Sequence, residues 1–572
     1  MQKIIKTRLP LTTNTVSPHP LLNRIYQARG ITNSEQLLLS LKQLHHPNLL
    51  ANIDQAVDLL YAAYQRQARL VIVGDFDADG ATSTALALLA LRQFGFEQVD
   101  YLIPDRFSQG YGLSVAVAEM VLAKGAEFVL TVDNGISSFD GIALLKANQV
   151  QVLVTDHHLP AESLPNADAM INPNLTACTF PSKSLAGVGV IFYVMIALRT
   201  KLRQEKAFTD KPEPNIADLL DLVALGTVAD VVPFDHNNRI LVAQGLQRIQ
   251  SGHCRVGIQA LAEVAKRDLH RLQASDLGFA IAPRLNAAGR LENMALGVEL
   301  LICENLNTAR QLALELDSLN QTRKEFEQEM KAEALAICAK LPDLSDNTQA
   351  KGIVLFQADW HQGVLGILAS RIKDQFHRPV IAFAQDDEQG HYLKGSARSI
   401  AGVHMRDLLE RIDQQQPDLI VKFGGHAMAA GLTIAKEKLP AFQQAFDHTL
   451  QQFVAPDQLQ GVIYTDGELQ PHEMTLDTAE LLQQAGPWGQ HFAEPVFEGQ
   501  FRILQQRLVG QKHLKMMVEN QAGMLFDAIW FNVDLRQFPD LSIQQARLVY
   551  QLDINEYRGN RSVQLFIVYL SI

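Results

Sequence analysis

Four short apolar runs rich in valine, isoleucine and leucine recur between residues 69 and 156, and stretches of helical length separate them. This alternation is typical of βαβ units, whose strands form one parallel sheet. The runs are residues 69–74, 99–104, 127–133 and 151–156. Polar residues follow each run, and ligands of open α/β sheets bind beyond the carboxyl ends of the strands. The sequence therefore predicts an α/β fold whose functional groups gather at one edge of a parallel sheet.

The size and charge of the chain limit how it can hold a ligand. It has 572 residues, of which 47% are hydrophobic and 20% charged, a composition typical of folded proteins. One core cannot bury so long a chain efficiently, so we expect several domains. With 50 basic and 62 acidic residues the net charge is −12, the opposite of the basic balance of many nucleic-acid binders. A phosphate-bearing ligand would therefore have to be held by a local cluster of basic residues.

No targeting or cysteine-based feature stands out. The start of the chain lacks the apolar stretch of a secretory signal, and the longest nearly uncharged stretch, residues 185–198, is shorter than the ~20 residues that span a bilayer. It contains Gly187 and Gly189 but lacks the third glycine of a dinucleotide fingerprint, so nicotinamide chemistry is not supported. The four cysteines lack the spacing of disulfide frameworks and zinc sites. We expect a cytoplasmic protein without a membrane segment, with 185–198 as a buried helix.

Beyond the first sheet the pattern changes three times. Residues 307–341 carry apolar residues at helical spacing and stop at Pro342, which predicts one long connecting helix. A second α/β segment begins at Gly352, in which residues 436–455 are predicted as mixed helix and linker. From Gly461 onward short β-rich runs favour a small all-β module. The expected units are an N-terminal extension 1–65, a first α/β domain 66–305, a connecting helix 306–345, a second α/β domain 346–458 and a β-barrel domain 459–572.

Asp75, Asp77 and Asp79 leave the end of the first apolar run, where the next helical stretch begins. Two carboxylates about 4 Å apart repel by roughly 4 kcal/mol at an effective dielectric constant near 20, so the cluster needs a cation or partial protonation. A hard divalent metal resolves this conflict. The spacing also matches the opening of an EF-hand calcium loop, but Leu86 stands where that loop needs a bidentate carboxylate, and a strand precedes it.

Two further runs end in side chains that bind metals. Asp133 ends the third run, Asp156 ends the fourth, and His157 and His158 follow it. One aspartate at a strand end is often a helix cap, and one histidine is more often a satisfied core residue than a ligand. Three strand ends at one sheet edge are harder to explain in that way. Carboxylate combined with imidazole suits Mn²⁺ as well as Mg²⁺, and Asp230 could add a further carboxylate.

The motifs VGDFDADG, TVDNGI, TDHH and GTVADVVP resemble, in this order, the four motifs of the DHH phosphoesterase superfamily. Over nearly its whole length the chain resembles the bacterial exonucleases of that superfamily that degrade single-stranded DNA from the 5′ end. PRLNAAGR at 283–290 resembles the segment that closes their first domain. KGSARS at 394–399 and FGGHAMAAG at 423–431 resemble their DHH-associated domain, and the C-terminal module resembles their OB-fold.

The resemblance implies a fold, a reaction and a metal site. The fold is a multidomain α/β protein: a parallel-sheet DHH catalytic domain, a long connecting helix, a second α/β DHH-associated domain and a C-terminal OB-fold barrel. The reaction is 5′→3′ hydrolysis of single-stranded DNA to mononucleotides, in DNA repair and recombination. Two cations, Mn²⁺ or Mg²⁺, would be held by Asp75, Asp77, Asp79, Asp133, His157 and Asp230. The catalytic residues implied are Asp77, Asp79, Asp133, His157 and His158.

Individual roles within that site differ. His158 would lie beside the scissile phosphate. Asp156 is expected to orient the imidazoles or to cap a turn rather than to bind metal. Simpler members of the superfamily place only two carboxylates at the first motif, so direct ligation by Asp75 stays open.

Recognition of a 5′ end requires a pocket for the terminal phosphate, which guanidinium groups bind through paired hydrogen bonds. The resemblance assigns this pocket to Arg106, Ser396 and Arg398, although a single arginine is often only a solvated surface residue. The other substrate-binding residues that it implies are Tyr111, Arg284, Asn286, Arg290, Gly425 and His426. Tyr111 would stack on a base but could equally belong to the core, and the glycine-rich segment could be an ordinary turn. Basic residues between Arg502 and Lys515 would contact a longer strand.

Two other functions compete with this interpretation. A phosphoesterase for dinucleotides, short oligonucleotides or pyrophosphate would need neither the N-terminal extension nor the C-terminal module. A non-catalytic scaffold at replication forks would have no use for concentrated carboxylates. The resemblance also suggests a RecQ-type helicase and a single-strand-binding protein as partners, and we expect a monomer.

Overall fold

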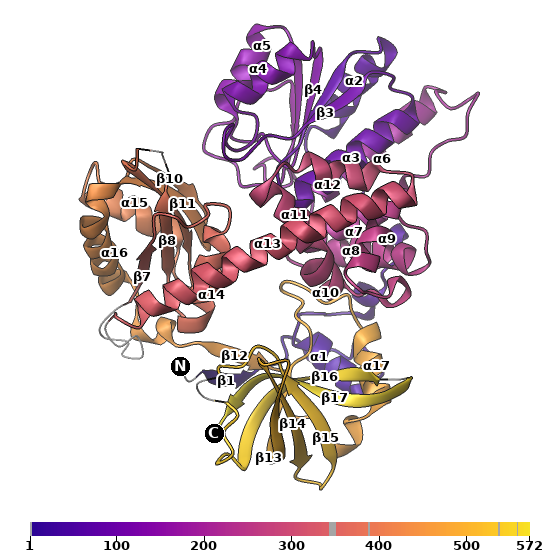
Figure 1. Ribbon diagram of the computed structural model, residues 1–572. Helices are drawn as coiled ribbons and strands as arrows, with labels where there is room; N and C mark the ends of the chain where they lie inside the picture. Colours follow the sequence, from indigo (N-terminus) through magenta and orange to yellow (C-terminus); the bar gives the residue numbers. More distant parts are fainter. Residues whose placement is uncertain (1–2, 342–350, 387–388, 536–537, 558) are drawn as a thin grey trace.

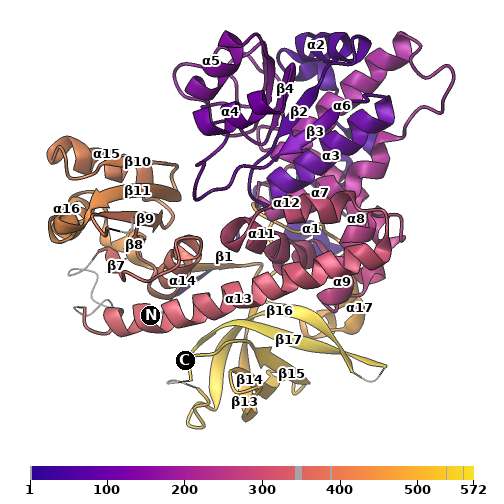
Figure 2. The same ribbon diagram turned by 45° about the horizontal axis from the view of Figure 1, so that its top comes forward.

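The computed structural model describes residues 3–341, 351–386, 389–535, 538–557 and 559–572. Figures 1 and 2 show a first α/β domain, a second α/β domain reached through the long helix α13 (Leu306–Cys338), and a β-barrel at the bottom of Figure 1. Among the described residues no helix is both long and apolar enough to cross a bilayer.

The first domain is built on a sheet of five parallel strands in the order β3-β2-β4-β5-β6. They are β2 (Leu70–Val73), β3 (Val99–Leu102), β4 (Phe128–Val132), β5 (Gln151–Thr155) and β6 (Ala169–Ile171). The runs after which we expected metal-binding side chains are β2, β4 and β5, which are neighbours in the sheet and almost entirely buried. Their carboxyl ends therefore bring three distant segments together at one edge.

Helices cover both faces of this sheet (Figure 1). On one face lie α2 (Ile53–Gln65), α3 (Ala78–Phe94) and α6 (Gly187–Gln204), and on the other α4 (Val115–Ala123) and α5 (Phe139–Ala147). The predicted buried helix at 185–198 is α6. Further helices pack beneath α3: α7 (Leu220–Ala229), α8 (His236–Gln250), α9 (Val256–Val264), α10 (Ala274–Asp276), α11 (Ala282–Leu291) and α12 (Ala295–Ile302).

The second domain has a sheet in the order β10-β11-β9-β8-β7, in which only the β7–β8 pair is parallel. Its strands are β7 (Ile353–Phe356), β8 (Val380–Gln385), β9 (Tyr392–Arg398), β10 (Lys422–Gly425) and β11 (Ala429–Ala435). Its helices are α14 (Leu365–Phe376), α15 (Met405–Gln415) and α16 (Leu439–Phe453). Separate cores form on the α14 face and on the α15/α16 face. The stretch 436–455, predicted as mixed helix and linker, is mostly the helix α16, on which Phe442, Ala445, Phe446 and Leu450 form one buried stripe.

The C-terminal domain is a closed barrel in the order β13-β14-β15-β17-β16. The strands are β13 (Phe497–Val509), β14 (His513–Asn520), β15 (Leu525–Trp530), β16 (Gln545–Tyr557) and β17 (Asn560–Ser571). A helix that the sequence did not suggest, α17 (Leu476–Gln484), precedes the barrel.

The first 65 residues do not form a unit of their own. Strand β1 (Ile4–Thr7) pairs in parallel with β12 (Val462–Thr465), the segment that leads toward the barrel. Helix α1 (Pro20–Gln27) packs beside the barrel, and α2 belongs to the first domain. The extension therefore ties the barrel to the first domain.

A stack of aromatic and arginine side chains holds this junction. Trp488 and Phe492 stack with ring centroids 5.1 Å apart, Arg29 lies 5.2 Å over Trp488 and Arg239 lies 4.4 Å over Phe492. Buried Arg29 also forms an ion pair of 2.7 Å with Asp466. One continuous apolar core runs from the first domain through this junction into the barrel. The barrel is therefore fixed to the first domain, whereas the second domain has separate cores.

Candidate metal and phosphate site between the two α/β domains

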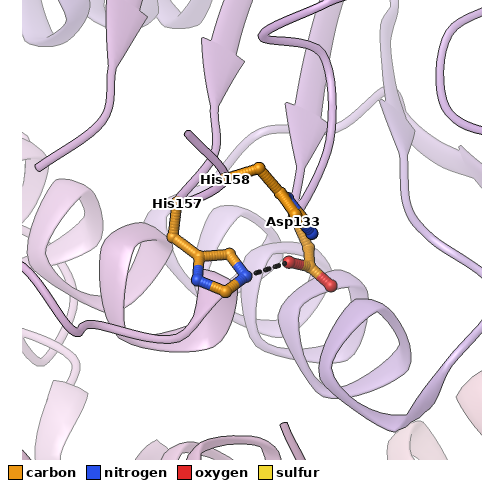
Figure 3. A group of neighbouring side chains, drawn as sticks. All are labelled: Asp133, His157 and His158. Atoms are coloured by element: carbon orange, nitrogen blue, oxygen red, sulfur yellow. Dashed lines mark ion pairs between the residues drawn. The ribbon is translucent and has the colours of Figure 1, made fainter. Parts of the chain in front are cut away.

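Carboxylates and imidazoles from four segments meet at the carboxyl edge of the first sheet. Asp75, Asp77 and Asp79 follow β2, Asp133 follows β4, His157 and His158 follow β5, and Asp230 ends α7. Figure 3 shows the imidazole of His157 directed at Asp133, with 3.1 Å between Nε2 and Oδ1. His157 Nε2 also lies 3.5 Å from Asp230 Oδ2. The structure thus brings every expected metal-binding residue to one place.

The cluster divides into two triads whose ligand atoms lie within 4.8 Å of one another. One consists of Asp79, His157 and Asp230, and the other of Asp75, Asp77 and Asp133. Asp133 also groups with His157 and His158, so it lies between the two triads. Such an arrangement offers two adjacent positions for hard cations.

Helix starts hold the first motif in place. Asp77 is the N-cap of α3, where its Oδ1 accepts a hydrogen bond of 3.0 Å from the amide of Gly80. Asp79 accepts hydrogen bonds from the amides of Gly187 (2.6 Å) and Val188 (3.0 Å) in the first turn of α6. Two helix N-termini therefore stabilise negative charge at this edge.

Two glycines allow helices to pack closely against the carboxylates of the cluster. The sequence did not assign either of them to the site. A Cβ at Gly187 would lie 2.5 Å from Asp133 Oδ1, and one at Gly226 would lie 2.3 Å from Thr82 Oγ1 and 2.8 Å from Asp79 Oδ1. Any side chain there would displace a candidate ligand. Gly226 stands inside the GTVADVVP motif, and Gly187 was considered only as part of a dinucleotide fingerprint. Because glycine is unfavourable inside a helix, these two positions could have been recognised from the sequence as sites of close packing.

The electrostatics of the cluster favour a bound cation. Burial, reinforced by neighbouring aspartates, raises the pKa of Asp79 to about 7 and raises the pKa values of Asp75, Asp133 and Asp230 well above the usual range. Burial lowers the pKa of His157 to about 4, so its ring is neutral at neutral pH. Asp133 Oδ1 and His157 Nε2 are buried and have no hydrogen-bond partner among the described residues. Crowded carboxylates, a neutral imidazole and unpartnered ligand atoms fit a divalent metal site.

Asp156 organises the histidine pair. Its Oδ1 accepts hydrogen bonds from the amides of His157 (2.7 Å) and His158 (3.1 Å) and pairs with His158 Nδ1 at 2.7 Å, while Oδ2 accepts from the amide of Ile136. Burial alone would lower the pKa of His158, but the hydrogen bond and charge of Asp156 raise it to about 9. His158 is therefore cationic at neutral pH. Tyr111, which is 52% exposed, places its hydroxyl 3.3 Å from His158 Nε2.

Three arginines face this cluster from both domains. The guanidinium of Arg106 lies 4.3 Å over the ring of Phe76 and feels the charges of Asp75 and Asp77. Arg290 donates to the carbonyl of Gly363 (3.0 Å), and burial, with Arg106 and Arg398 nearby, lowers its pKa to about 10. Within the described ranges none of the three arginines has a carboxylate at ion-pair distance. Half-buried cations that repel one another are suited to an anion.

Arg398 lies against the first turn of α14. Its Nη1 contacts Ser396 Oγ at 3.2 Å, and a Cβ on Gly366 would lie 2.5 Å from Arg398 Nη2. The guanidinium, the hydroxyl and the positive end of a helix therefore converge on one position.

Other expected substrate-binding residues have different surroundings. Arg284 forms an ion pair of 2.8 Å with Asp317 of α13, so its charge is already neutralised. Asn286 accepts a hydrogen bond of 2.9 Å from the amide of Ala78 and so supports the first motif. The backbone amide of His426 donates to the carbonyl of Ala429 (2.8 Å), so only the side chain of this residue could contact a phosphate. The His426 side chain is largely exposed. Its partial burial, and next the charge of His158, lower its pKa.

Three segments of the chain match known domain families. Residues 69–227 match the DHH family, N-terminal domain, residues 349–452 match the DHHA1 domain, and residues 465–569 match the RecJ OB domain. The chain is thus a DHH-type protein with a parallel-sheet DHH domain, a connecting helix, a DHHA1 domain and an OB-fold barrel. The expected fold class is confirmed.

Relatives of similar length are exonucleases. The chain is 61% identical to the single-stranded-DNA-specific exonuclease RecJ of Haemophilus influenzae, over 100% of this chain and 99% of that protein. It is 56% identical to the RecJ protein of Escherichia coli, over 96% and 95% of the two chains. The crystal structure of RecJ from Thermus thermophilus in complex with Mn²⁺ superposes with a TM-score of 0.80 at 28% identity, over 100% of this chain and 79% of that one. The chain belongs to the RecJ family.

Proposed function

We propose that this protein is a metal-dependent exonuclease that degrades single-stranded DNA from the 5′ end to mononucleotides, in DNA repair and recombination. The observation that carries the proposal is the meeting of a carboxylate–imidazole cluster with three arginines that lack an ion-pair partner among the described residues. The RecJ relatives are named as single-stranded-DNA-specific exonucleases, and solved RecJ structures contain Mn²⁺ or Mg²⁺.

The two triads would each hold one divalent cation, Mn²⁺ or Mg²⁺. Asp79, His157 and Asp230 form one ligand set, and Asp75, Asp77 and Asp133 form the other. When bound, such ions supply Lewis-acid activation of water and neutralise charge on the phosphate. In the reaction the oxygen of water joins phosphorus and the bond to the 3′ oxygen breaks, which leaves a 3′-hydroxyl and a 5′-phosphate.

His158 would act on the phosphate directly. Its Nδ1 is held by Asp156 at 2.7 Å, so its Nε2, which lies 3.3 Å from the Tyr111 hydroxyl, would donate a hydrogen bond to a phosphate oxygen. Its pKa of about 9 keeps the imidazolium form present at neutral pH. Tyr111, beside Nε2, lies where the adjoining nucleotide would pass and is exposed enough to contact a base.

The arginines would set the 5′→3′ direction of degradation. Arg106 and Arg398, with Ser396 and the start of α14, form a position for the terminal 5′-phosphate next to the metal cluster. A strand bound there through its 5′ end presents the first internucleotide linkage to the carboxylates. Half-buried Arg290, close to Arg106 and Arg398, would add positive charge at this position.

The barrel would hold the remainder of a long strand. Of the basic residues expected to do so, Arg502 pairs with Glu519 (2.7 Å) and Lys515 with Asp527 (3.3 Å), so these two contribute little net charge. Arg507 and Lys512 have no such partner among the described residues. The salt-dependent part of strand binding is therefore assigned to Arg507 and Lys512.

The proposal also covers the setting of the reaction. We place the enzyme in the cytoplasm, as a monomer that acts with a RecQ-type helicase and a single-strand-binding protein.

The decisive experiment offers three Mn²⁺-containing reactions: a 5′-phosphorylated single strand, its blunt duplex and a dinucleotide, each labelled at either end. We expect mononucleotides from the 5′ end of the single strand only. Release from the dinucleotide alone would favour a small-substrate phosphoesterase, and no release would favour a scaffold.

The variant Asp77→Asn should abolish release because it removes a ligand charge but keeps the α3 cap. Asp54→Asn, at an exposed position of α2, is the matched control.

A further inference from the structure

An aromatic stack joins the two α/β domains next to the arginines. The ring of Phe107, in the loop after β3, meets the imidazole of His361 edge-on with centroids 6.0 Å apart. His361, in the loop before α14, lies flat on Phe326 of α13 with centroids 5.3 Å apart and an interplanar angle of 12°. The three rings come from the first domain, the second domain and the connecting helix. The function proposed above does not use them.

This aromatic bridge, Phe107–His361–Phe326, adjoins the arginines in the chain and at the contact between the domains. Arg106 feels the charges of Asp75 and Asp77 on one side and is followed directly in the chain by Phe107. Arg290 of the first domain donates to the carbonyl of Gly363 in the second domain, two residues after His361. The arginines and the aromatic bridge therefore share one stretch of the contact between the two domains.

Local hydrogen bonds fix both ends of the bridge. Asp105 Oδ1 accepts from the amides of Phe107 (3.0 Å) and Ser108 (2.8 Å), and the amide of Asp105 donates to Gln109 Oε1 (2.9 Å), so the loop is closed on itself. His361 Nδ1 accepts from the amide of Gly363 (3.1 Å). A Cβ at Gly363 would lie 2.3 Å from the carbonyl oxygen of Arg290, so the two domains are in close contact here.

The three rings of the bridge touch one another where the two domains and the connecting helix meet. Carbon atoms in contact lie about 3.5–4.0 Å apart, so rings whose centroids are 5.3 and 6.0 Å apart touch at their edges and faces.

We propose that the Phe107–His361–Phe326 bridge is the end wall of the strand-binding channel and makes cleavage depend on a free 5′ end. Arginines attract the terminal phosphate, but attraction alone would also accept an internal phosphate. The wall excludes internal segments because their chain would have to continue through the rings. This inference rests on the proposed exonuclease function and adds the origin of its end dependence. Phe107 and His361 would act as positioning residues, through the ring contact that joins them.

The test compares a circular single strand with a linear 5′-phosphorylated strand of the same sequence, in Mn²⁺. Phe107→Ala and His361→Ala open the wall from opposite domains. We expect both to raise the ratio of circle to linear cleavage at least about tenfold over the unmodified protein, because a circle offers no end to bind. Phe107→Tyr keeps the aromatic ring, so this variant should show the same low ratio as the unmodified protein. Phe453→Ala, at an exposed aromatic of α16 that packs under Arg411, is the matched control and should not change the ratio.

The outcomes separate the two proposals. If the unmodified protein releases no nucleotides from the linear strand, the exonuclease function fails. If it does, but both alanine variants leave circles intact, the wall is refuted, whether their linear activity is kept or lost. Thermal unfolding of each variant shows whether lost activity comes from a lost fold, and two positions in different domains guard against one variant that does not fold. If Phe107→Tyr raises the ratio as much as Phe107→Ala does, the wall is also refuted.

Discussion

Replacing Asp133 with asparagine should stabilise the metal-free protein while weakening its affinity for Mn²⁺. Asp133 Oδ1 is buried and has no hydrogen-bond partner among the described residues, so the substitution loses no hydrogen bond there. The backbone at this residue is left-handed, with φ of 62°, a conformation that asparagine tolerates at least as well as aspartate. The change therefore removes one charge at nearly constant shape.

The expected size follows from the distances within the cluster. The ligand atoms of Asp75, Asp77 and Asp133 lie within 4.8 Å of one another. A pair of unit charges at that distance repels by roughly 3 kcal/mol at an effective dielectric constant of 20. Partial protonation already relieves part of this repulsion, so we expect a gain of about 1–3 kcal/mol in the free energy of unfolding. For a domain of this size that raises the unfolding temperature by roughly 2–10 °C.

The dependence on pH tests the same argument. Asp79 has a pKa of about 7 in the folded protein and that of Asp133 is also raised, so the folded chain keeps protons that the unfolded chain releases near pH 4. Without metal, stability therefore falls as pH rises from about 4 through about 7. Asp133→Asn should make this fall shallower, because it removes one raised pKa and lowers the pKa values of its neighbours.

The assay is thermal unfolding in EDTA and in Mn²⁺, at about pH 5 and about pH 8. Bound cation stabilises the folded protein by about 2.7 kcal/mol when it is present at a hundred times Kd. We expect the unmodified protein to gain more from Mn²⁺ than the variant, and the variant to be the more stable in EDTA. An unfolding temperature in EDTA that is unchanged or lower in the variant would refute the repulsion argument.

Three further predictions concern other parts of the molecule. Arg398→Lys should lower the rate on a 5′-phosphorylated strand about tenfold and the rate on a 5′-hydroxyl strand much less, because it removes the forked contact. Asp156→Asn should remove the charge that holds the pKa of His158 near 9, so the alkaline limb of a kcat/KM–pH profile should move to lower pH. Trp488→Ala should lower the free energy of unfolding by about 2–4 kcal/mol in urea titrations, since it opens the junction between Arg29 and Phe492.

Local patterns predicted the first sheet and the strands that carry the site. The runs at 69–74, 127–133 and 151–156 contain β2, β4 and β5, and each of these strands is short and apolar with an aspartate within two residues of its end. Adjacent parallel strands must end at one edge, so the grouping of their carboxylates could be expected without knowledge of the loops. Residues 436–455 could have been predicted as well, since the helical spacing of Phe442, Ala445 and Phe446 is visible in the sequence.

Other features depend on contacts that no local pattern records. Gly187 and Gly226 matter because two helices approach Asp133 and Asp79 within the space of one Cβ, which only the packed structure reveals. Arg284 occurs in the same motif as Arg290, yet α13 places Asp317 beside it and neutralises it. The position of the first 65 residues is set by partners far along the chain.

The parallel pairing of β1 with β12 has a consequence for biosynthesis. Ile4 can meet Val462 only after roughly 460 further residues have left the ribosome, which at about 5–20 residues per second takes roughly half a minute to a minute and a half. During that time the edge of β1 has no partner, and α1 lacks the rings of Trp488 and Phe492. Docking of the chain's opening segment is therefore among the last events of assembly, and a nascent chain that stalls before residue 462 would expose this strand to chaperones or to aggregation.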